Sequence, residues 1–295
     1  MPARLIVVPT PIGNLGDITA RALDALREAD VVFAEDTRRT GALLAHFEIH
    51  KPMRSLFVGN ERTRSAAALG ELRAGKVVAL VSDAGTPGIS DPGAYLIQAA
   101  IAESIAVEAL PGAQAILPAL LLSGLPPAPF TFVGFLPRAR TARREVLEVV
   151  RDFPWTLVFY EAPHRLAAML GDAHAVLGPR PAAVVREISK VHEETRRGDL
   201  GTLASWAEAE PPRGEIAVVV GGAPAVPAAG DPTDLGAFIA ARLEQGDSPT
   251  AAARAGRDAG FSRQEAYREA LRQAGKAPHA RSGSTPEGDS DKPRD

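Results

Sequence analysis

Hydrogen-bonding side chains are concentrated in a loop that directly follows an apolar, strand-like run. The loop spans residues 82–93, SDAGTPGISDPG, after the run KVVALV, and its glycines and prolines make it rigid. It carries carboxylates and hydroxyls that can accept protons or bind a polar ligand, namely Asp83, Thr86, Ser90 and Asp91. A turn that caps the next helix is the simpler alternative. The length and polarity of the loop favour a ligand site.

A second charged loop, AEDTRRTG, follows the apolar run VVF. It places Glu35 and Asp36 beside Arg38 and Arg39. The acidic residues either stabilise the start of a helix through its dipole or line a polar substrate site. If the two apolar runs are neighbouring parallel strands, both loops lie at the same edge of one sheet, which favours the substrate site.

Two stretches in the second half of the chain repeat this arrangement. FYEAPHR brings Glu161, His164 and Arg165 together, and His164 acts either as a base or as a structural hydrogen-bond partner. REISKVHEE adds three charged residues that either form a surface ion-pair set or border the same cleft, namely Arg186, Glu187 and Lys190. The segment 137–145, PRARTARRE, holds four arginines. A solvated helix face is its ordinary interpretation, whereas an RNA substrate would supply phosphates for it to bind.

Composition limits the kinds of chemistry that are open to the chain. It has 295 residues, no cysteine and a formal net charge of -3, so disulfides and thiolate metal sites are excluded and any polyanion must bind a local basic patch. No HExxH or Gly-x-Ser-x-Gly pattern occurs, so we expect neither a metal site nor a serine hydrolase. The N-terminal apolar run is too short for a signal peptide, and we expect a soluble cytoplasmic protein.

Alternating apolar runs and helical patterns must position these loops. In the first half they predict a mostly parallel, doubly wound sheet. The expected strands are 4–8, 30–36, 76–83 and 105–110, and the expected helices are 19–29, 39–47, 65–75, 94–104 and 114–124. After a proline cluster, a second αβ domain is expected with strands 131–135, 155–163, 182–189 and 215–222 and helices 142–152 and 165–177.

The chain therefore divides into five predicted segments. We expect an α/β fold with an N-terminal αβ domain at 1–124 and a C-terminal αβ domain at 125–222, which together form a cleft. A Gly/Pro/Ala linker covers 223–232, three short helices form a helical domain at 233–275, and the polar segment 276–295 is expected to be disordered.

The order of these motifs resembles one family. VPTPIGNLGDIT, AEDTRRTG, SDAGTPGISDPG, LPG, GFLPR, FYEAPHR, REISKVHEE and GEIAVVV occur as they do in the bacterial small-subunit ribosomal RNA (cytidine-2′-O-)-methyltransferases. These enzymes belong to the tetrapyrrole methylase superfamily. The resemblance covers about residues 5–222, and the helical segment after it is similar to that family's small C-terminal domain. It departs at SLFVGNERT, where Asn60 is kept but Val58 and Gly59 replace the family's usual histidines.

The resemblance implies a homodimer that uses S-adenosylmethionine as methyl donor and no metal. By motif position the donor contacts are Ile12, Ser82, Asp83, Ala84, Gly85, Thr86, Gln114, Ala115, Tyr160, Glu161, Ile216 and Ala217. The implied substrate is a cytidine in the decoding region of the small-subunit (16S) ribosomal RNA, within the 30S subunit, methylated on its ribose 2′-oxygen. Residues expected at the substrate are Glu35, Arg38, Asn60, Ser90, Asp91, Arg165, Arg186, Glu187 and Lys190.

A ribose hydroxyl is a poor nucleophile, so a base or hydrogen-bond acceptor is expected beside it. The candidates are Asp36, Asp83, Glu161 and His164, and the carboxylates are favoured because the strand-end loops concentrate them. Two other functions remain open. One is a methyltransferase that acts on a tetrapyrrole-like small molecule, and the other is a non-catalytic RNA-binding factor in ribosome assembly.

Overall fold

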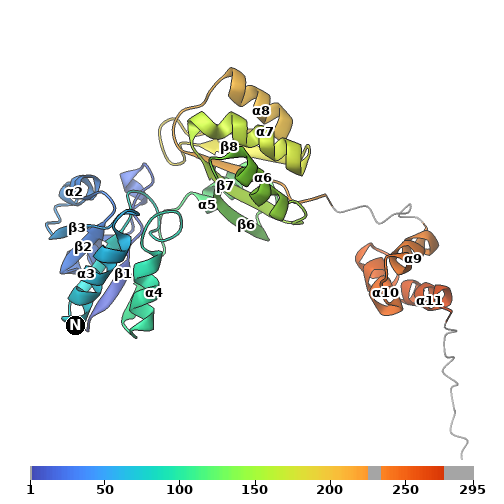
Figure 1. Cartoon of the computed structure of the whole chain (residues 1–295), viewed down its shortest axis with the longest axis horizontal. Helices are drawn as coiled ribbons and strands as arrows, with labels where there is room; N and C mark the ends of the chain where they lie inside the picture. Colours follow the sequence, from blue (N-terminus) through green and yellow to red (C-terminus); the bar gives the residue numbers. More distant parts are fainter. Residues whose placement is uncertain (1, 225–233, 276–295) are drawn as a thin grey trace, which may run out of the picture. The chain divides into compact units, whose positions relative to one another are not determined.

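A computed structural model describes residues 2–224 and 234–275 of the chain (Figure 1). The chain divides into two compact units between Ala223 and Pro224. Most of the predicted linker, 225–232, and the whole tail 276–295 that we expected to be disordered lie outside the described residues. Among the helices that the structure describes, none is long and apolar enough to cross a membrane.

The first sheet, within residues 2–224, has five parallel strands in the order β3-β2-β4-β1-β5. Its strands are β1 (Arg4–Val7), β2 (Val31–Ala34), β3 (Met53–Ser55), β4 (Val77–Val81) and β5 (Ala106–Ala109). This confirms the predicted parallel sheet and places the loops after β2 and β4 at one edge, because these strands are neighbours. The sequence analysis does not include β3, since its three residues, MRS, form no apolar run.

Helices cover both faces of this sheet. They are α1 (Ala20–Glu28), α2 (Thr37–His46), α3 (Glu61–Arg73) and α4 (Ala94–Ala102), with a short 3-10 helix η1 (Leu15–Asp17) in the first loop. Adjacent residues of β1 point to opposite faces, so Ile6 packs with Leu26 of α1 while Leu5 packs with Leu72 of α3. Thr19 caps α1 by accepting a hydrogen bond from the Ala22 N–H at 3.0 Å.

The second sheet is mixed, in the order β6-β7-β10-β8-β9. Its strands are β6 (Phe130–Phe135), β7 (Thr156–Glu161), β8 (Pro181–Arg186), β9 (Glu194–Asp199) and β10 (Ile216–Val220). Only the β6–β7 pair is parallel, while β10 and β9 run antiparallel to their neighbours. The connection between β8 and β9 spans only 187–193, which is too short for the crossover that a parallel pair requires.

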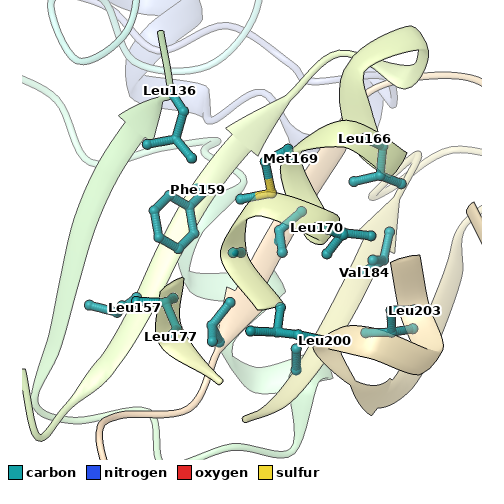
Figure 2. Packing of buried hydrophobic residues seen from close by; sticks show 14 of the residues in the cluster. Leu136, Leu157, Phe159, Leu166, Met169, Leu170, Leu177, Val184, Leu200 and Leu203 are labelled. Atoms are coloured by element: carbon teal, nitrogen blue, oxygen red, sulfur yellow. The ribbon is translucent and has the colours of Figure 1, made fainter. Parts of the chain in front are cut away.

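Helices pack on this sheet to form the largest cluster of buried residues shown in Figure 2. They are α6 (Arg140–Val149), α7 (Leu166–Leu177) and α8 (Leu200–Ala209), with the 3-10 helix η2 (Pro163–Arg165) after β7. Phe159 of β7, Met169 of α7 and Leu203 of α8 are almost completely buried in this cluster. Strand β9 and helix α8 lie outside the prediction. The sequence of β9, ETRRGD, has no apolar residue, whereas α8 was missed although its Leu200 and Leu203 are buried.

The helix α5 (Ile116–Ser123) follows the last strand of the first sheet but packs on the second. Its Ala119 and Leu120 are buried against Val158 of β7 and Val219 of β10. The expected boundary at residue 124 therefore falls after a helix whose buried side chains belong to the core of the second sheet.

Within the described residues 234–275 of the second unit, the structure has three short helices, as the capping pattern predicts (Figure 1). They are α9 (Leu235–Glu244), α10 (Pro249–Asp258) and α11 (Arg263–Gln273). Phe238 and Ile239 of α9 pack with Ala252 of α10 and Ala270 of α11. Ser248 and Ser262 cap α10 and α11 by accepting hydrogen bonds from backbone N–H groups.

Candidate functional site

A cavity of about 760 Å³ is lined by the loops after β1, β4 and β5 and by the ends of β6, β7 and β10. Most of its lining is apolar, with a few polar groups, as in sites for small molecules and cofactors. Its walls include Ile12, Ala84, Gly85, Thr86, Ile89, Ser90, Asp91, Gln114, Ala115, Ile116, Leu117, Phe135, Tyr160, Glu161, Glu215, Ile216 and Ala217.

Most of the residues predicted to contact the methyl donor lie at this cavity. Ten of the twelve line it, and the two exceptions, Ser82 and Asp83, line a smaller hollow of about 470 Å³ beside the loop after β1. The predicted substrate residues Ser90 and Asp91 also line the larger cavity. Motifs from Ile12 to Ala217, which span most of the first unit's sequence, therefore line one cavity.

The loops after β1 and β4 are joined where they meet. Thr10 and Gly85 form an antiparallel bridge with reciprocal backbone hydrogen bonds of 2.9 and 2.8 Å. The Thr10 hydroxyl donates to the Ser82 carbonyl at 3.0 Å. Gly85 has a φ of +79°, a conformation that glycine adopts without strain. These bonds form a rigid wall between the cavity and the smaller hollow.

A close approach between Gly112 and Pro9 shapes the part of the wall formed by the loop after β5. A Cβ atom on Gly112 would lie 2.8 Å from Cβ of Pro9, closer than real Cβ contacts allow. Thr86 donates a hydrogen bond to the carbonyl of Ala113 at 3.3 Å, which ties the loop after β4 to the loop after β5. The glycine of the LPG motif thus permits the close packing that brings Gln114 and Ala115 into the cavity wall.

An aromatic group lies at the β6–β7 edge of the cavity. The Tyr160 ring contacts Phe132 and Phe135, with ring centroids 4.9 and 5.6 Å away. Burial, reinforced by the negative charge of Asp91, raises the pKa of Tyr160 to about 12, while a backbone hydrogen bond at Ala115 opposes the shift. The phenol is neutral at physiological pH and can donate a hydrogen bond to a ligand.

Glu161 is the most enclosed carboxylate of the cavity. Its Oε1 accepts a hydrogen bond from the Ala162 N–H at 2.8 Å and lies 3.1 Å from Nε of Arg165. Its Oε2 is buried and has no hydrogen-bond partner among the described residues. A buried acceptor without a partner is costly, so this oxygen is suited to receive a donor from a ligand.

Three carboxylates meet where the loops after β2 and β4 lie side by side. Burial, together with the nearby charge of Asp91, raises the pKa of Glu35. Burial also raises the pKa of Asp91, and Asp83 adds to that shift. Asp91 lines the larger cavity and Asp83 the smaller hollow, whereas Glu35 lines neither of them. Acidic groups held close together despite their mutual repulsion are typical of functional sites.

Replacing Glu35 with glutamine is expected to change how stability depends on pH. The native state binds the Glu35 proton more tightly than the unfolded chain does, because its pKa is raised from 4.5. Stability from this group is therefore present at low pH and is lost as pH rises through the raised native pKa. Urea unfolding from pH 4 to 8 should show Glu35→Gln gaining stability relative to the natural chain as pH rises. Glu145→Gln, at an exposed position on α6, serves as the control. Parallel pH profiles of stability for Glu35→Gln and the natural chain would contradict the expectation.

Asp36 and Asp83 are held by local hydrogen bonds. Asp36 caps α2 and pairs with Arg38 at 2.7 Å, and these hydrogen bonds from Arg38 hold the Asp36 pKa well below its usual range. Asp83 accepts a hydrogen bond from the Asp36 N–H at 2.9 Å and lies 3.3 Å from Arg39. Both carboxylates thus fix the start of α2, and only Asp83 lines a hollow.

Two other predicted residues have different surroundings. Asn60 precedes α3, and its side chain accepts a hydrogen bond from the Phe57 N–H at 2.8 Å rather than capping that helix. His164 is exposed on η2 and is not part of the lining of either hollow. Glu61, which follows Asn60, contacts the loop after β4, because its side chain accepts a hydrogen bond from the Gly93 N–H at 2.8 Å.

The predicted charged residues of the second half form ion pairs. Arg165 donates to the Leu136 carbonyl at 2.6 Å, in addition to its contact with Glu161. Arg186 pairs with Glu194 at 2.7 Å. Lys190 pairs with Glu187 at 2.9 Å and with Glu215 at 3.1 Å.

The connection between β8 and β9 reaches the first βα loop. A Cβ atom on Gly13 would lie 2.3 Å from Cγ of Lys190, so this glycine leaves room for the lysine side chain. Ser189 donates a hydrogen bond to Asp17 in the same first loop. Loops from the two sheets are therefore joined beside the cavity, where Gly13 is needed for close approach.

Several residues of the cavity are absent from the prediction. They include Ile89, Leu110, Pro111, Gly112, Ile116, Leu117, Phe135, Ile188 and Glu215. Most are apolar, and composition alone gives no reason to separate them from core residues. Phe135 and Gly112 lie within the motifs GFLPR and LPG, which are the signal that could have identified them. Within 2–224 and 234–275, no cluster of three His, Asp or Glu residues is arranged to hold a metal ion.

Comparison with known proteins identifies the family. Residues 4–204 match the model of the tetrapyrrole (corrin/porphyrin) methylases. The curated ribosomal RNA small subunit methyltransferase I of Micromonospora olivasterospora is 49% identical over 242 residues, covering 82% of this chain and 76% of that protein. The protein of the same name from Halalkalibacterium halodurans is 46% identical over 218 residues, covering 74% and 75%.

A solved structure supports the fold independently. Uroporphyrin-III C-methyltransferase from Thermus thermophilus, in complex with S-adenyl homocysteine, superposes with a TM-score of 0.52 at 22% identity, covering 74% of this chain and 97% of that chain. The family match and the curated relatives confirm the resemblance noted in the sequence. The chain therefore belongs to the tetrapyrrole (corrin/porphyrin) methylases, and among them to the family of its small-subunit ribosomal RNA methyltransferase relatives.

Proposed function

We propose that the chain transfers a methyl group from S-adenosylmethionine to the ribose 2′-oxygen of a cytidine in the decoding region of small-subunit (16S) ribosomal RNA. The names of the curated relatives support the reaction class and the RNA substrate. The motif resemblance supports the cytidine and its 2′-oxygen. The observation that carries the proposal is the cavity itself, because ten donor contacts implied by separate motifs converge on it.

The cavity residues fit the methyl donor in size and chemistry. A volume of about 760 Å³ lies within the range of cofactor sites. Ile12, Ile216 and Ala217 offer apolar surface, and the Thr86 hydroxyl and the Gln114 side chain add polar groups to the lining. The unpartnered Glu161 Oε2 would accept a hydrogen bond from a donor group of the bound molecule.

Catalysis requires orientation and removal of one proton. S-Adenosylmethionine supplies an electrophilic methyl group on a sulfonium, so no metal is required. The ribose 2′-oxygen forms the new bond to the methyl carbon as the carbon–sulfur bond breaks, and the hydroxyl proton passes to a carboxylate. Asp91 lines the cavity and has a raised pKa, so it accepts a proton more readily than an ordinary aspartate does. Rigid loops such as the Thr10–Gly85 bridge hold the reacting groups in line.

The remaining expected residues have supporting roles in this proposal. Asp36 and Asp83 position the loops after β2 and β4, and Glu161 binds the donor molecule. Arg38, whose side chain is 89% exposed, is available to an RNA phosphate. We further propose that the active form is a cytoplasmic homodimer acting on the 30S subunit, which light scattering and assays on free RNA against assembled subunits would test.

Mapping of ribose methylation tests the proposed function. Ribosomal RNA from a strain lacking this gene should lose a single 2′-O-methylcytidine in mass spectrometry of nuclease fragments. The purified full chain with S-adenosylmethionine should restore it on 30S subunits from that strain. An unchanged methylation map would overturn the proposal, and S-adenosylmethionine binding without methylation of RNA would favour the tetrapyrrole-like substrate. Failure to bind S-adenosylmethionine would favour the assembly factor.

A further inference from the structure

Three arginines of α6 surround one buried carboxylate of α7. Asp172 Oδ2 accepts hydrogen bonds from Nε and Nη2 of Arg143 at 2.9 and 2.6 Å. Its Oδ1 receives Nε of Arg144 at 2.7 Å and Nε of Arg140 at 3.2 Å. Burial alone would raise the pKa of Asp172, but these hydrogen bonds hold it below its usual value, so the carboxylate is ionised.

The cluster has more positive charge than Asp172 needs for neutralisation. Arg143 is buried and binds Asp172 through two nitrogens, which satisfies the carboxylate within the core. Arg140 and Arg144 share the other oxygen, and their side chains are 71% and 39% exposed. One negative charge against three guanidinium groups leaves an excess of two positive charges, and the exposed Arg138 adds a third.

The exposed arginines begin next to the cavity. Phe135 at the end of β6 lines the cavity, and Arg138 follows it by three residues, at most about 11 Å along the backbone. Arg165 fixes this connection by donating to the carbonyls of Leu136 and Pro137 at 2.6 and 3.3 Å. Arg143 donates to the Arg138 carbonyl at 3.1 Å, which joins the connection to α6.

Fixed guanidinium groups suit phosphate oxygens. Asp172 holds Nε of Arg140 and Arg144 and restricts their rotamers, while the remaining N–H groups of these exposed side chains are available to an anion. Because the chain as a whole is negative, with a net charge of -3, a strand of phosphates would be attracted to this surface rather than to the molecule in general.

We propose that Arg138, Arg140 and Arg144 bind backbone phosphates of the ribosomal RNA strand next to the nucleotide that enters the cavity. This inference rests on the proposed function and names the surface that holds its substrate. The arginines position RNA and take no part in the methyl transfer.

The test is a triple variant, Arg138→Gln, Arg140→Gln and Arg144→Gln, in the full-length chain. Arg143 is kept, so Asp172 retains its buried partner and the fold is preserved. Arg151→Gln is the matched control, because Arg151 is a half-exposed arginine just beyond α6, about 16 Å from Arg140. Methyl transfer to 30S subunits is measured at several salt concentrations, and S-adenosylmethionine affinity is measured by calorimetry.

For the triple variant we expect the KM for 30S subunits to rise about tenfold or more at 0.15 M salt, with kcat within about twofold. The slope of log binding constant against log salt should decrease by about 2 to 3, since each lost phosphate contact contributes roughly 0.7 to 0.9. S-Adenosylmethionine affinity should match that of the natural chain. An unchanged KM and salt slope in the triple variant, with an active natural chain, would overturn the inference. An inactive natural chain would instead contradict the proposed function.

Discussion

Replacing Glu161 with glutamine is expected to weaken S-adenosylmethionine binding about 10- to 100-fold. The glutamine amide oxygen can keep the hydrogen bond from the Ala162 N–H, but an NH2 group then occupies the position of the unpartnered Oε2. A donor group of the ligand would meet another donor there, and a hydrogen bond to a charged acceptor, which contributes about 1.5–3 kcal/mol, is lost. Calorimetric titration with S-adenosylmethionine measures the change directly.

Glu215→Gln is the matched control for this variant. Glu215 lines the same cavity, but its side chain is 68% exposed and its carboxylate pairs with Lys190. We expect the Glu215→Gln variant to bind S-adenosylmethionine with an affinity within about threefold of the natural chain's, because exposed ion pairs contribute little to binding or stability. Equal affinities of Glu161→Gln and the natural chain would show that Glu161 does not contact the donor.

Replacing Asp172 with alanine is expected to destabilise the first unit by about 3–5 kcal/mol. The side chains of Asp172 and Arg143 are only 5% and 7% exposed, so the substitution leaves a buried guanidinium without its partner. For a unit of this size, the midpoint of thermal unfolding should fall by about 6–20 °C. Differential scanning calorimetry and urea unfolding provide the measurement.

Two further variants separate charge from packing. Asp152→Ala removes an exposed aspartate that pairs with Arg151 at 3.4 Å, and we expect it to cost less than about 0.5 kcal/mol. The double variant Asp172→Ala with Arg143→Met should recover much of the lost stability, because it no longer contains the buried unpaired charge. A single Asp172→Ala variant as stable as the Asp152→Ala control would refute the assigned role.

Sequence periodicity predicted most of the elements whose side chains enter a core, although it missed α8, whose Leu200 and Leu203 are buried. Strands β1, β2 and β4 are buried on both faces and therefore form continuous apolar runs such as LIVV and VVALV. Strand β9 pairs with β8 along the edge of the second sheet, and its charged residues form ion pairs instead. Strand β9 is held by backbone hydrogen bonds to β8, and the residue pattern of β9 alone does not indicate this pairing. The mixed direction of that sheet was missed for the same reason.

The candidate site was predictable where polar residues follow strands. Asp91 lies in the loop after β4 and Glu161 is the last residue of β7, and both line the same cavity. The partners of each carboxylate could not be predicted, because they depend on side-chain directions after packing. Asp36 and Glu161 look alike in the sequence, yet Asp36 caps a helix while Glu161 has a buried oxygen without a partner among the described residues.

Helix α5 determines where this protein can be cut. A fragment that ends at residue 124 would carry α5 away from the strands that cover Ala119 and Leu120, and it would expose an apolar surface that favours aggregation. A fragment that begins at residue 125 would leave the facing residues Val158 and Val219 open to water. Dissection into separately expressed halves should therefore place the junction in the 110–115 segment, so that α5 stays with the sheet it packs against.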